Sequence, residues 1–239
     1  MIVEPFSVGA HNIHNEGEYS ERELAWRKIG AIDKARNLQH LLDGRSVSSV
    51  LEVGCGTGAV LAEVARLGVG TEHVGVDVAD PHAHLDVVAA ELQIAEYDGQ
   101  VLPFSDNSFD FVFASHVVEH VEEPRALLRE LKRVARDYVY LEVPCELTAR
   151  TTRAAMQRSL NIGHINAFTP ESFILLVQTS DLKVLDSAVF DHSREVYAFT
   201  SSRLEAAAKK TIRGGLRALN QRFASRVFTY HCGVLCAPE

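Results

Sequence analysis

From residue 47 onward, short apolar runs alternate with segments in which apolar residues recur every three or four positions. The first pattern is typical of buried strands and the second of helices that cover a sheet. Their alternation predicts right-handed βαβ units, and therefore a doubly wound, mostly parallel α/β sheet with helices on both faces. Pro144 is expected to end the fifth strand. We expect strands at 50–53, 73–77, 93–97, 109–114, 138–143, 182–190 and 227–237, and helices at 59–67, 124–134 and 169–179.

The first 46 residues do not follow this alternation. They are expected to form an N-terminal arm and a helical cap on the main domain, residues 47–239. Ser20 and Glu23 have the spacing of a capping box, which predicts that a helix begins there. A second helical piece is expected at 31–42, where apolar residues again share one face.

Two insertions interrupt the main domain, at about 145–165 and 201–226. The first is polar and basic and is expected to form a loop or lid over the strand ends. Within the second, residues 203–226 hold seven basic side chains against one acidic one, with apolar residues at helical spacing. This pattern predicts a basic amphipathic helix or helix pair, broken near Gly214 and Gly215. Such a helix either packs on the core with a solvated basic face, or contacts an anionic membrane surface or an anionic substrate.

Composition narrows the class of protein. The chain has 239 residues, a formal net charge of −8 and 46% hydrophobic residues, which fit one globular α/β domain rather than a disordered or fibrous chain. The negative charge argues against a protein that tracks nucleic-acid phosphates. No apolar run reaches the roughly 18–20 residues that cross a bilayer, and no signal-peptide pattern is present, so we expect a cytoplasmic protein.

The cysteines give no sign of a disulfide framework. Cys55, Cys145, Cys232 and Cys236 are widely spaced and form no CxxC pair. Reduced thiols are therefore expected, with neither a disulfide nor a zinc site.

The most specific chemistry follows the first predicted strand, where residues 52–58 read EVGCGTG. Open α/β sheets bind ligands at the carboxyl ends of their strands. Gly54, Gly56 and Gly58 let the backbone turn tightly and approach a ligand, and the helix that follows presents unpaired N–H groups. The alternative is a tight turn that binds nothing. Glu52, just before the loop, places an anion where a cationic amine can bind.

Two further carboxylates follow the next two predicted strands. Asp77 lies 19 residues past the last glycine of the loop, where a carboxylate can accept both hydroxyls of a ribose. Asp98 can accept a hydrogen bond from an exocyclic amine such as that of adenine. The structural alternatives are a helix cap for Asp77 and a turn residue beside Gly99 for Asp98.

Several ordered motifs together resemble a known family. VLEVGCGTG, GVD and LPFSDNSFDFVFASHVVEHV occur in this order. They resemble the class I, Rossmann-like S-adenosylmethionine-dependent methyltransferases, and within them the small-molecule branch that includes the ubiquinone and menaquinone biosynthesis enzymes (methyltransferase type 11). The resemblance covers about residues 47–200. It implies a seven-stranded sheet with an antiparallel last strand, and transfer of a methyl group from S-adenosyl-L-methionine that leaves S-adenosyl-L-homocysteine.

The resemblance also implies roles for particular residues. The glycine loop would line the methionine portion of the cofactor, Asp77 would hold the ribose, Val78 would face the adenine and Asp98 would accept from its amine. Ser115 and His116 would lie beside the sulfonium. The full set of implied cofactor-binding residues is Glu52, Gly54, Cys55, Gly56, Gly58, Asp77, Val78, Asp98, Gly99 and Ser115.

Three histidines are candidates for the group that removes a proton from the acceptor. An oxygen or nitrogen acceptor loses a proton on methylation, and histidine is suited to take it near neutral pH. The candidates are His116, His120 and His164, and for each the alternative is a packed or solvated histidine. They favour O-methylation of a small molecule such as a quinone precursor, a sugar or glycolipid intermediate, or a secondary metabolite.

The remaining histidines and one tyrosine are weaker candidates. Tyr19 is either part of a lid or an ordinary surface residue. No metal site is expected, because the four other closely spaced histidines are typical of loops. These are His11, His14, His82 and His84.

Two other functions fit part of the pattern. Gly54-x-Gly56-x-x-Ala59, followed by Asp77, also matches the fingerprint of an NAD-dependent oxidoreductase. That function requires further phosphate contacts and a hydride-transfer constellation, which the sequence does not show. A non-catalytic module that binds S-adenosylmethionine is the other alternative, and the intact carboxylates argue against it.

Overall fold

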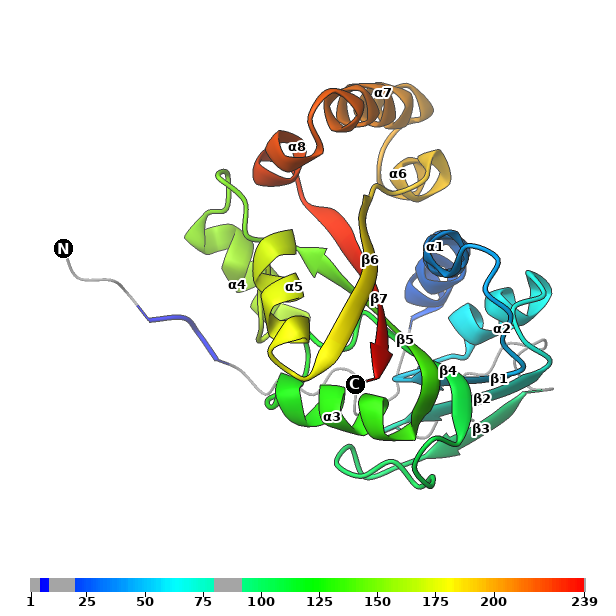
Figure 1. Ribbon diagram of the computed structural model, residues 1–239. Helices are drawn as coiled ribbons and strands as arrows, with labels where there is room; N and C mark the ends of the chain where they lie inside the picture. The colour runs from blue at the N-terminus through cyan, green and yellow to red at the C-terminus, as the bar shows by residue number, and fades with distance from the viewer. Residues whose placement is uncertain (1–4, 9–19, 80–91, 239) are drawn as a thin grey trace.

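The computed structural model describes residues 5–8, 20–79 and 92–238. Its centre is a seven-stranded sheet with the order β3-β2-β1-β4-β5-β7-β6 (Figure 1). The first five strands are parallel to one another, whereas β7 is antiparallel to both β5 and β6. This topology confirms the predicted fold class. The strands are β1 (Ser49–Val53), β2 (Glu72–Asp77), β3 (Gln93–Glu96), β4 (Phe109–Ser115), β5 (Ala135–Cys145), β6 (Leu182–Phe190) and β7 (Tyr230–Pro238).

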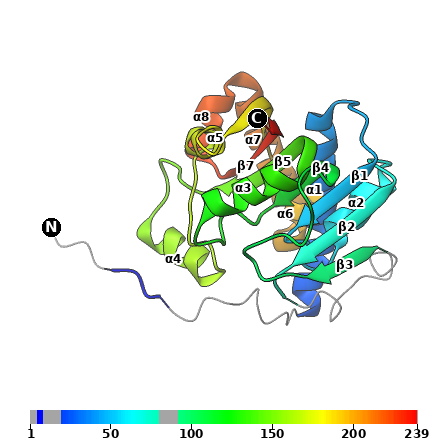
Figure 2. The ribbon, with the colours of Figure 1, turned by 60° about the horizontal axis from the view of Figure 1, so that its bottom comes forward.

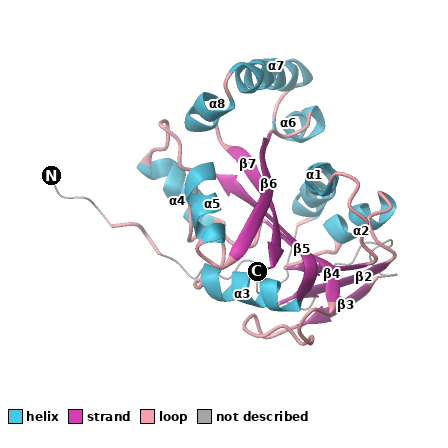
Figure 3. Ribbon diagram, viewed as in Figure 1, coloured by secondary structure: helices cyan, strands magenta, loops and turns pink. Residues whose placement is uncertain are grey.

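Helices cover both faces of this sheet (Figure 3). Those that pack on one face are α1 and α2, while α3 and α5 pack on the other. Beyond the end of β6, α6, α7 and α8 form a separate group (Figure 1). The helices are α1 (Glu21–Leu42), α2 (Ala59–Arg66), α3 (Pro124–Val134), α4 (Arg153–Asn161), α5 (Pro170–Gln178), α6 (Arg194–Thr200), α7 (Arg203–Leu219) and α8 (Gln221–Val227).

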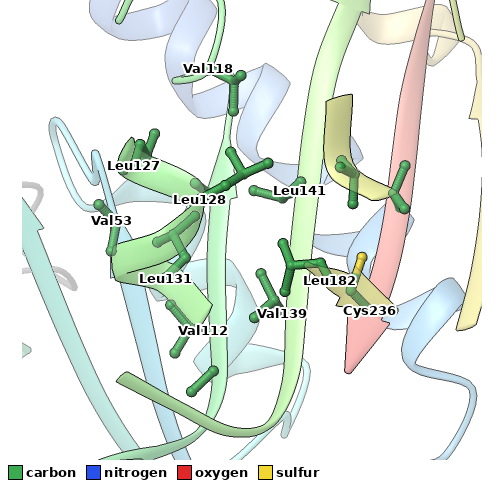
Figure 4. Packing of buried hydrophobic residues seen from close by; sticks show 14 of the residues in the cluster. Val53, Val112, Val118, Leu127, Leu128, Leu131, Val139, Leu141, Leu182 and Cys236 are labelled. Carbon is green, nitrogen blue, oxygen red and sulfur yellow. The ribbon is translucent and has the colours of Figure 1, made fainter. Parts of the chain in front are cut away.

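Alternation along the central strands builds two hydrophobic layers. Successive side chains of a strand point to opposite faces of the sheet. Val112 therefore packs with Leu128 of α3 (Figure 4), whereas Phe113 packs on the other face with Leu38 of α1. Among the polar side chains of these strands, Glu52, Ser115 and Glu142 are buried and line the cleft described below.

The N-terminal helix differs from the prediction of two pieces. Residues 21–42 form one continuous helix, which begins with the predicted capping box of Ser20 and Glu23. Gly30 lies inside it, and a glycine within a helix costs only about 1 kcal/mol. Ala31, Ala35 and Leu38 are buried along one face, and this packing offsets that cost.

The predicted break in the basic helix near Gly214 and Gly215 is also wrong. Gly214 and Gly215 lie within α7, and the helix ends instead at Leu219. Asn220 then separates it from α8, where its side chain accepts a hydrogen bond from the Phe223 N–H. A polar residue that caps the next helix is therefore a stronger stop signal here than two glycines.

The boundaries of the last strands differ for identifiable reasons. Pro144 does not end the fifth strand, which continues to Cys145. Since β4 pairs with β5 only as far as Glu142, the missing N–H of Pro144 removes no bond to β4. The last strand begins at Tyr230 rather than at residue 227, because Val227 still belongs to α8.

Two helices lie in segments where the pattern predicted none. The 145–165 insertion contains α4, which stands apart from the sheet in Figure 2. The short helix α6 follows Ser193, whose side chain caps it. Both are short, and neither shows a long apolar repeat.

The basic segment predicted to be amphipathic is helical, but its faces are arranged differently from a core-packed helix with a solvated basic face. Arg213 donates to Asp191 Oδ1 at 2.8 Å, and Arg217 donates to the Val189 carbonyl at 2.9 Å. Leu204 and Leu219 are instead 84% and 86% exposed. Contact with an anionic membrane or substrate stays a prediction. Within the described residues, no helix has both the length and the apolar character to cross a bilayer.

Candidate active site

A cleft of about 1220 Å³ opens at the carboxyl ends of the parallel strands. The glycine loop after β1, the ends of β2 and β4, and one side of α1 line it. All the predicted site residues except Gly58 line this cleft, including the three candidate histidines. Gly58 instead precedes α2 as its N-cap, with φ +71°. The predictions for Tyr19, His11, His14, His82 and His84 lie outside the described residues.

The glycine loop is held in a conformation that other residues adopt at a cost. Gly54 has φ +77°, and a Cβ there would stand 2.4 Å from Val117 Cγ2. Gly56 has φ +51°, and its N–H donates to Asp77 Oδ2 at 2.6 Å. Asp77 therefore joins the end of β2 to the loop after β1, and its other oxygen accepts from the Ala79 N–H at 3.2 Å.

Two buried oxygens at this edge have no partner within the described chain. Glu52 is 1% exposed and Ser115 is 6% exposed. Neither Glu52 Oε2 nor Ser115 Oγ has a hydrogen-bond partner among the residues that the structure describes. Burial raises the pKa of the Glu52 carboxyl well above its usual value, while Lys34 acts in the opposite direction. Unsatisfied buried oxygens that line a cleft are free to bind the polar groups of a ligand.

Asp98 lies at the exposed rim of the cleft. Its Oδ1 accepts from the N–H groups of Gln100 and Val101 at 2.8 and 2.9 Å, and these bonds lower the pKa of its carboxyl. A Cβ on Gly99 would stand 3.0 Å from Val78 Cγ1. The absence of a side chain at Gly99 thus leaves room for Val78 to lie over this turn. From there Val78 can pack against a flat ring.

His116 has an unusual backbone and a buried environment. Its φ is +60°, and its N–H donates to the Glu142 carbonyl at 2.8 Å. Strained conformations of this kind gather at functional sites. Burial lowers the pKa of the His116 imidazole well below its usual value, and the charge of Lys34 acts in the same direction. The ring is therefore neutral at neutral pH.

His120 and His164 lie together in the lining of the cleft. Their ring centroids are 4.8 Å apart in an edge-to-face arrangement. His120 Nδ1 is 3.0 Å from the Gly163 carbonyl, so the proton resides on Nδ1 and Nε2 carries the lone pair. His164 Nδ1 is 2.9 Å from Glu146 Oε2. These contacts orient both rings.

Glu146 and His164 perturb each other's ionisation. Burial acts to lower the pKa of His164, but the hydrogen bond to Glu146 acts in the opposite direction, and the pKa is raised. Burial acts to raise the pKa of Glu146, but the hydrogen bond from His164 acts in the opposite direction, and the pKa is lowered. The pair stabilises the fold most between these two pKa values. Its contribution is lost as the pH rises through the raised pKa of His164, or falls through the lowered pKa of Glu146.

We expect the Glu146→Gln variant to lower the pKa of His164, because a neutral amide no longer stabilises the imidazolium. The pKa is measured by NMR titration of the ring resonances. Asp137→Asn, a change at an exposed carboxylate outside the cleft, serves as the control and should leave this pKa unchanged. An unaltered His164 titration in Glu146→Gln would show that the ion pair does not set it.

Sequence reasoning missed several polar groups of the cleft. Glu142 lies in β5 and is fully buried, while His231 is the second residue of β7 and is 8% exposed. Lys34 comes from α1. A glutamate inside an otherwise apolar strand was the one available signal, because a buried charge requires partners.

The sequence matches a family model described as a methyltransferase domain over residues 22–187. The chain belongs to this methyltransferase domain family. The match spans the glycine loop, Asp77, Asp98 and all three candidate histidines, and it confirms the resemblance found in the motifs. Residues 188–238 contribute β7 and His231 to the methyltransferase domain but lie outside the matched range.

Individual relatives agree with this assignment. An uncharacterized methyltransferase of Mycobacterium avium is 39% identical over 89 residues, which cover 37% of this chain and 35% of that protein. The mitochondrial ubiquinone biosynthesis O-methyltransferase of Schizosaccharomyces pombe is 32% identical over 142 residues, or 54% of this chain and 50% of that protein. The chain thus spans between about a third and a half of the length of these two relatives.

A solved structure shows the same fold. A geranyl diphosphate methyltransferase in complex with geranyl diphosphate and sinefungin aligns with a TM-score of 0.62 at 13% identity, covering 86% of this chain and 77% of that one. At this identity the similarity establishes the fold of the methyltransferase domain and not its substrate.

Proposed function

We propose that this methyltransferase domain transfers a methyl group from S-adenosylmethionine to a small molecule, with oxygen as the favoured acceptor atom. The observation that carries the proposal is the buried Glu52 carboxylate beside the glycine loop, with Oε2 unpartnered among the described residues. A cationic amine would supply the missing partner and favour the ionised carboxylate. The named O-methyltransferase relative supports the choice of oxygen.

The residues of the cleft fit the cofactor group by group. Glycines in left-handed conformations at 54 and 56 leave room for a ligand chain against the backbone. In this proposal Asp77 would accept from the ribose hydroxyls and Val78 would pack against the adenine. Asp98 would accept from the adenine amine through the oxygen that its turn contacts do not use. Ser115 Oγ is a second buried oxygen without a partner among the described residues, and a hydrogen bond to the bound cofactor would satisfy it.

The chain's own chemistry is proton removal and positioning. When bound, S-adenosylmethionine supplies an electrophilic methyl carbon on a positively charged sulfur. As the acceptor oxygen bonds to that carbon, the carbon–sulfur bond breaks and its electron pair stays on sulfur. We assign His120 Nε2 to take the acceptor's proton, since Nδ1 is committed to Gly163. His164, held by Glu146, orients the His120 ring and, when protonated, attracts an anionic acceptor oxygen.

The geometry disfavours the NAD-dependent alternative. A dinucleotide places its diphosphate against the glycine loop. Here the buried Glu52 carboxyl lines the cleft beside that loop, and an ionised carboxylate there would repel a diphosphate. The same carboxylate attracts the amine of an amino acid.

The proposal is tested by ligand binding. We expect S-adenosylmethionine and S-adenosylhomocysteine to raise the melting temperature by several degrees at saturating concentration, because ligands that bind only the native state stabilise it. NAD at the same concentration should leave it unchanged. Protection by NAD alone would favour the oxidoreductase. Binding of S-adenosylmethionine without methylation of any compound in a panel of phenols, catechols and sugars would favour a non-catalytic module.

A further inference from the structure

Three side chains from neighbouring strands converge on one point of the cleft. His116 follows β4, Glu142 lies in β5 and His231 begins β7. His116 Nε2 is 2.9 Å from His231 Nδ1 and 3.5 Å from Glu142 Oε1. His231 Nδ1 is in turn 3.2 Å from the same Glu142 oxygen. Each residue thus contributes one atom to a compact triangle.

This triangle is better satisfied by a cation than by hydrogen bonds alone. If both nitrogens, His116 Nε2 and His231 Nδ1, carry protons directed at Glu142 Oε1, two N–H groups face each other across 2.9 Å, and if only one does, one edge keeps no donor. The three separations are those of ligands that surround one ion at about 2.0–2.1 Å, with angles of roughly 90–120°. Lone pairs from two imidazoles and one carboxylate then meet at a single centre.

Two of these side chains are also held by their second polar atom. His231 Nε2 is 3.2 Å from His192 Nε2. Glu142 Oε2 accepts from Asn37 Nδ2 at 3.2 Å and from the Tyr140 hydroxyl. Outer contacts of this kind fix the tautomer and direction of metal-ligating side chains. His116 Nδ1 lies 3.4 Å from Glu119 Oε1 without a hydrogen bond.

The local charge balance is consistent with a bound cation. Glu119 is 1% exposed, and neither of its carboxylate oxygens accepts a hydrogen bond from the chain at 5–8, 20–79 or 92–238. Together with Glu142, it places two buried carboxyls within 3.5 Å of His116. Lys34 interacts electrostatically with both. The two carboxyls outnumber this ammonium, so a bound cation would lie among an excess of acidic groups.

We propose that His116, Glu142 and His231 bind a divalent first-row transition metal ion, of which Zn²⁺ is the probe of choice. Two imidazoles and one carboxylate suit Zn²⁺, Mn²⁺ or Fe²⁺ rather than Mg²⁺ or Ca²⁺. Three protein ligands leave positions of the ion open to the cleft. A catalytic role rests on the proposed function: the ion would bind the acceptor oxygen and lower its pKa, and His120 would take the proton.

A neighbouring group of side chains is the competing position for an ion. Glu119, His120 and His164 also bring one ligand atom each within 4.8 Å of one another. There, however, His164 Nδ1 is engaged with Glu146 in an ion pair. The matched variants below therefore assign the ion to one group or the other.

The test is metal binding by the tag-free chain after treatment with a chelator. We expect calorimetry to show one Zn²⁺ per chain with a dissociation constant below about 1 μM. His231→Gln should weaken binding by about 100-fold or more, and His164→Gln should retain it. His116→Asn is the second ligand variant, because asparagine tolerates the left-handed backbone at this position. Co²⁺ bound to the wild type should give visible absorption bands that both ligand variants lose.

Three results would overturn the proposal. These are no binding by the wild type at about 100 μM Zn²⁺, binding kept by both ligand variants, or binding lost in His164→Gln but kept in His231→Gln. Calorimetry with S-adenosylhomocysteine on the same samples shows whether each variant is folded. It also separates the two proposals: loss of Zn²⁺ binding with S-adenosylhomocysteine binding intact concerns the metal alone, and failure of the wild type to bind S-adenosylhomocysteine concerns the proposed function alone.

Discussion

The Asp77→Ala variant should bind S-adenosylhomocysteine at least about 100-fold more weakly than the wild type. Asp77 Oδ2 holds the Gly56 N–H at 2.6 Å, so its loss releases the glycine loop as well as the contacts proposed for the ribose. Hydrogen bonds to a charged group contribute about 1.5–3 kcal/mol each, and two of them account for the expected loss. Isothermal titration calorimetry measures it.

The control for this prediction lies on the same strand. Glu72 begins β2 at the end remote from the cleft and is exposed. Glu72→Ala should therefore leave the affinity unchanged. A dissociation constant for Asp77→Ala within a few-fold of the wild-type value would refute the role of Asp77.

The His120→Ala variant should reduce kcat by about 100-fold or more while the affinity for S-adenosylhomocysteine stays the same. The expected loss follows from removing the group assigned to accept the proton. Turnover is measured as S-adenosylhomocysteine formed with the compound that the wild type methylates fastest. The decrease should be smaller at high pH, where an acidic acceptor ionises without help.

A histidine outside the cleft provides the control. His40 is exposed near the end of α1, and its ring packs against Phe190. His40→Ala should leave both kcat and cofactor affinity unchanged. An undiminished kcat in His120→Ala would show that His120 is not the group that takes the acceptor's proton.

The local part of the site was predictable from the sequence. The glycine loop, Asp77 and Asp98 each follow a strand within a few residues, so the periodicity that defines the strands also places these residues at one edge of the sheet. The capping box at Ser20 was equally readable, because its contacts span only three residues. Glycine was a poor guide in α7, where Gly214 and Gly215 were taken as a break, since the cap at Asn220 marks the end of that helix.

The rest of the site depends on contacts between distant segments. His116 and His231 are 115 residues apart in sequence, and Glu142 reaches both only because β7 pairs with β5. No spacing rule relates such residues. For the same reason, the sequence contains no metal-ligand spacing that could have revealed the triangle formed by these three side chains.

The position of β7 also bears on how the molecule is assembled. This strand is inserted between β5 and β6, although both of them are synthesised before it. Until residues 230–238 leave the ribosome, the facing edges of β5 and β6 lack their common partner, and unpaired edges promote association between chains. Because β7 runs opposite to β5, its first residues arrive at the open end of the cleft. A strand made after both of its neighbours therefore brings His231 to the cleft, so the cleft acquires this side chain only when β7 inserts between β5 and β6.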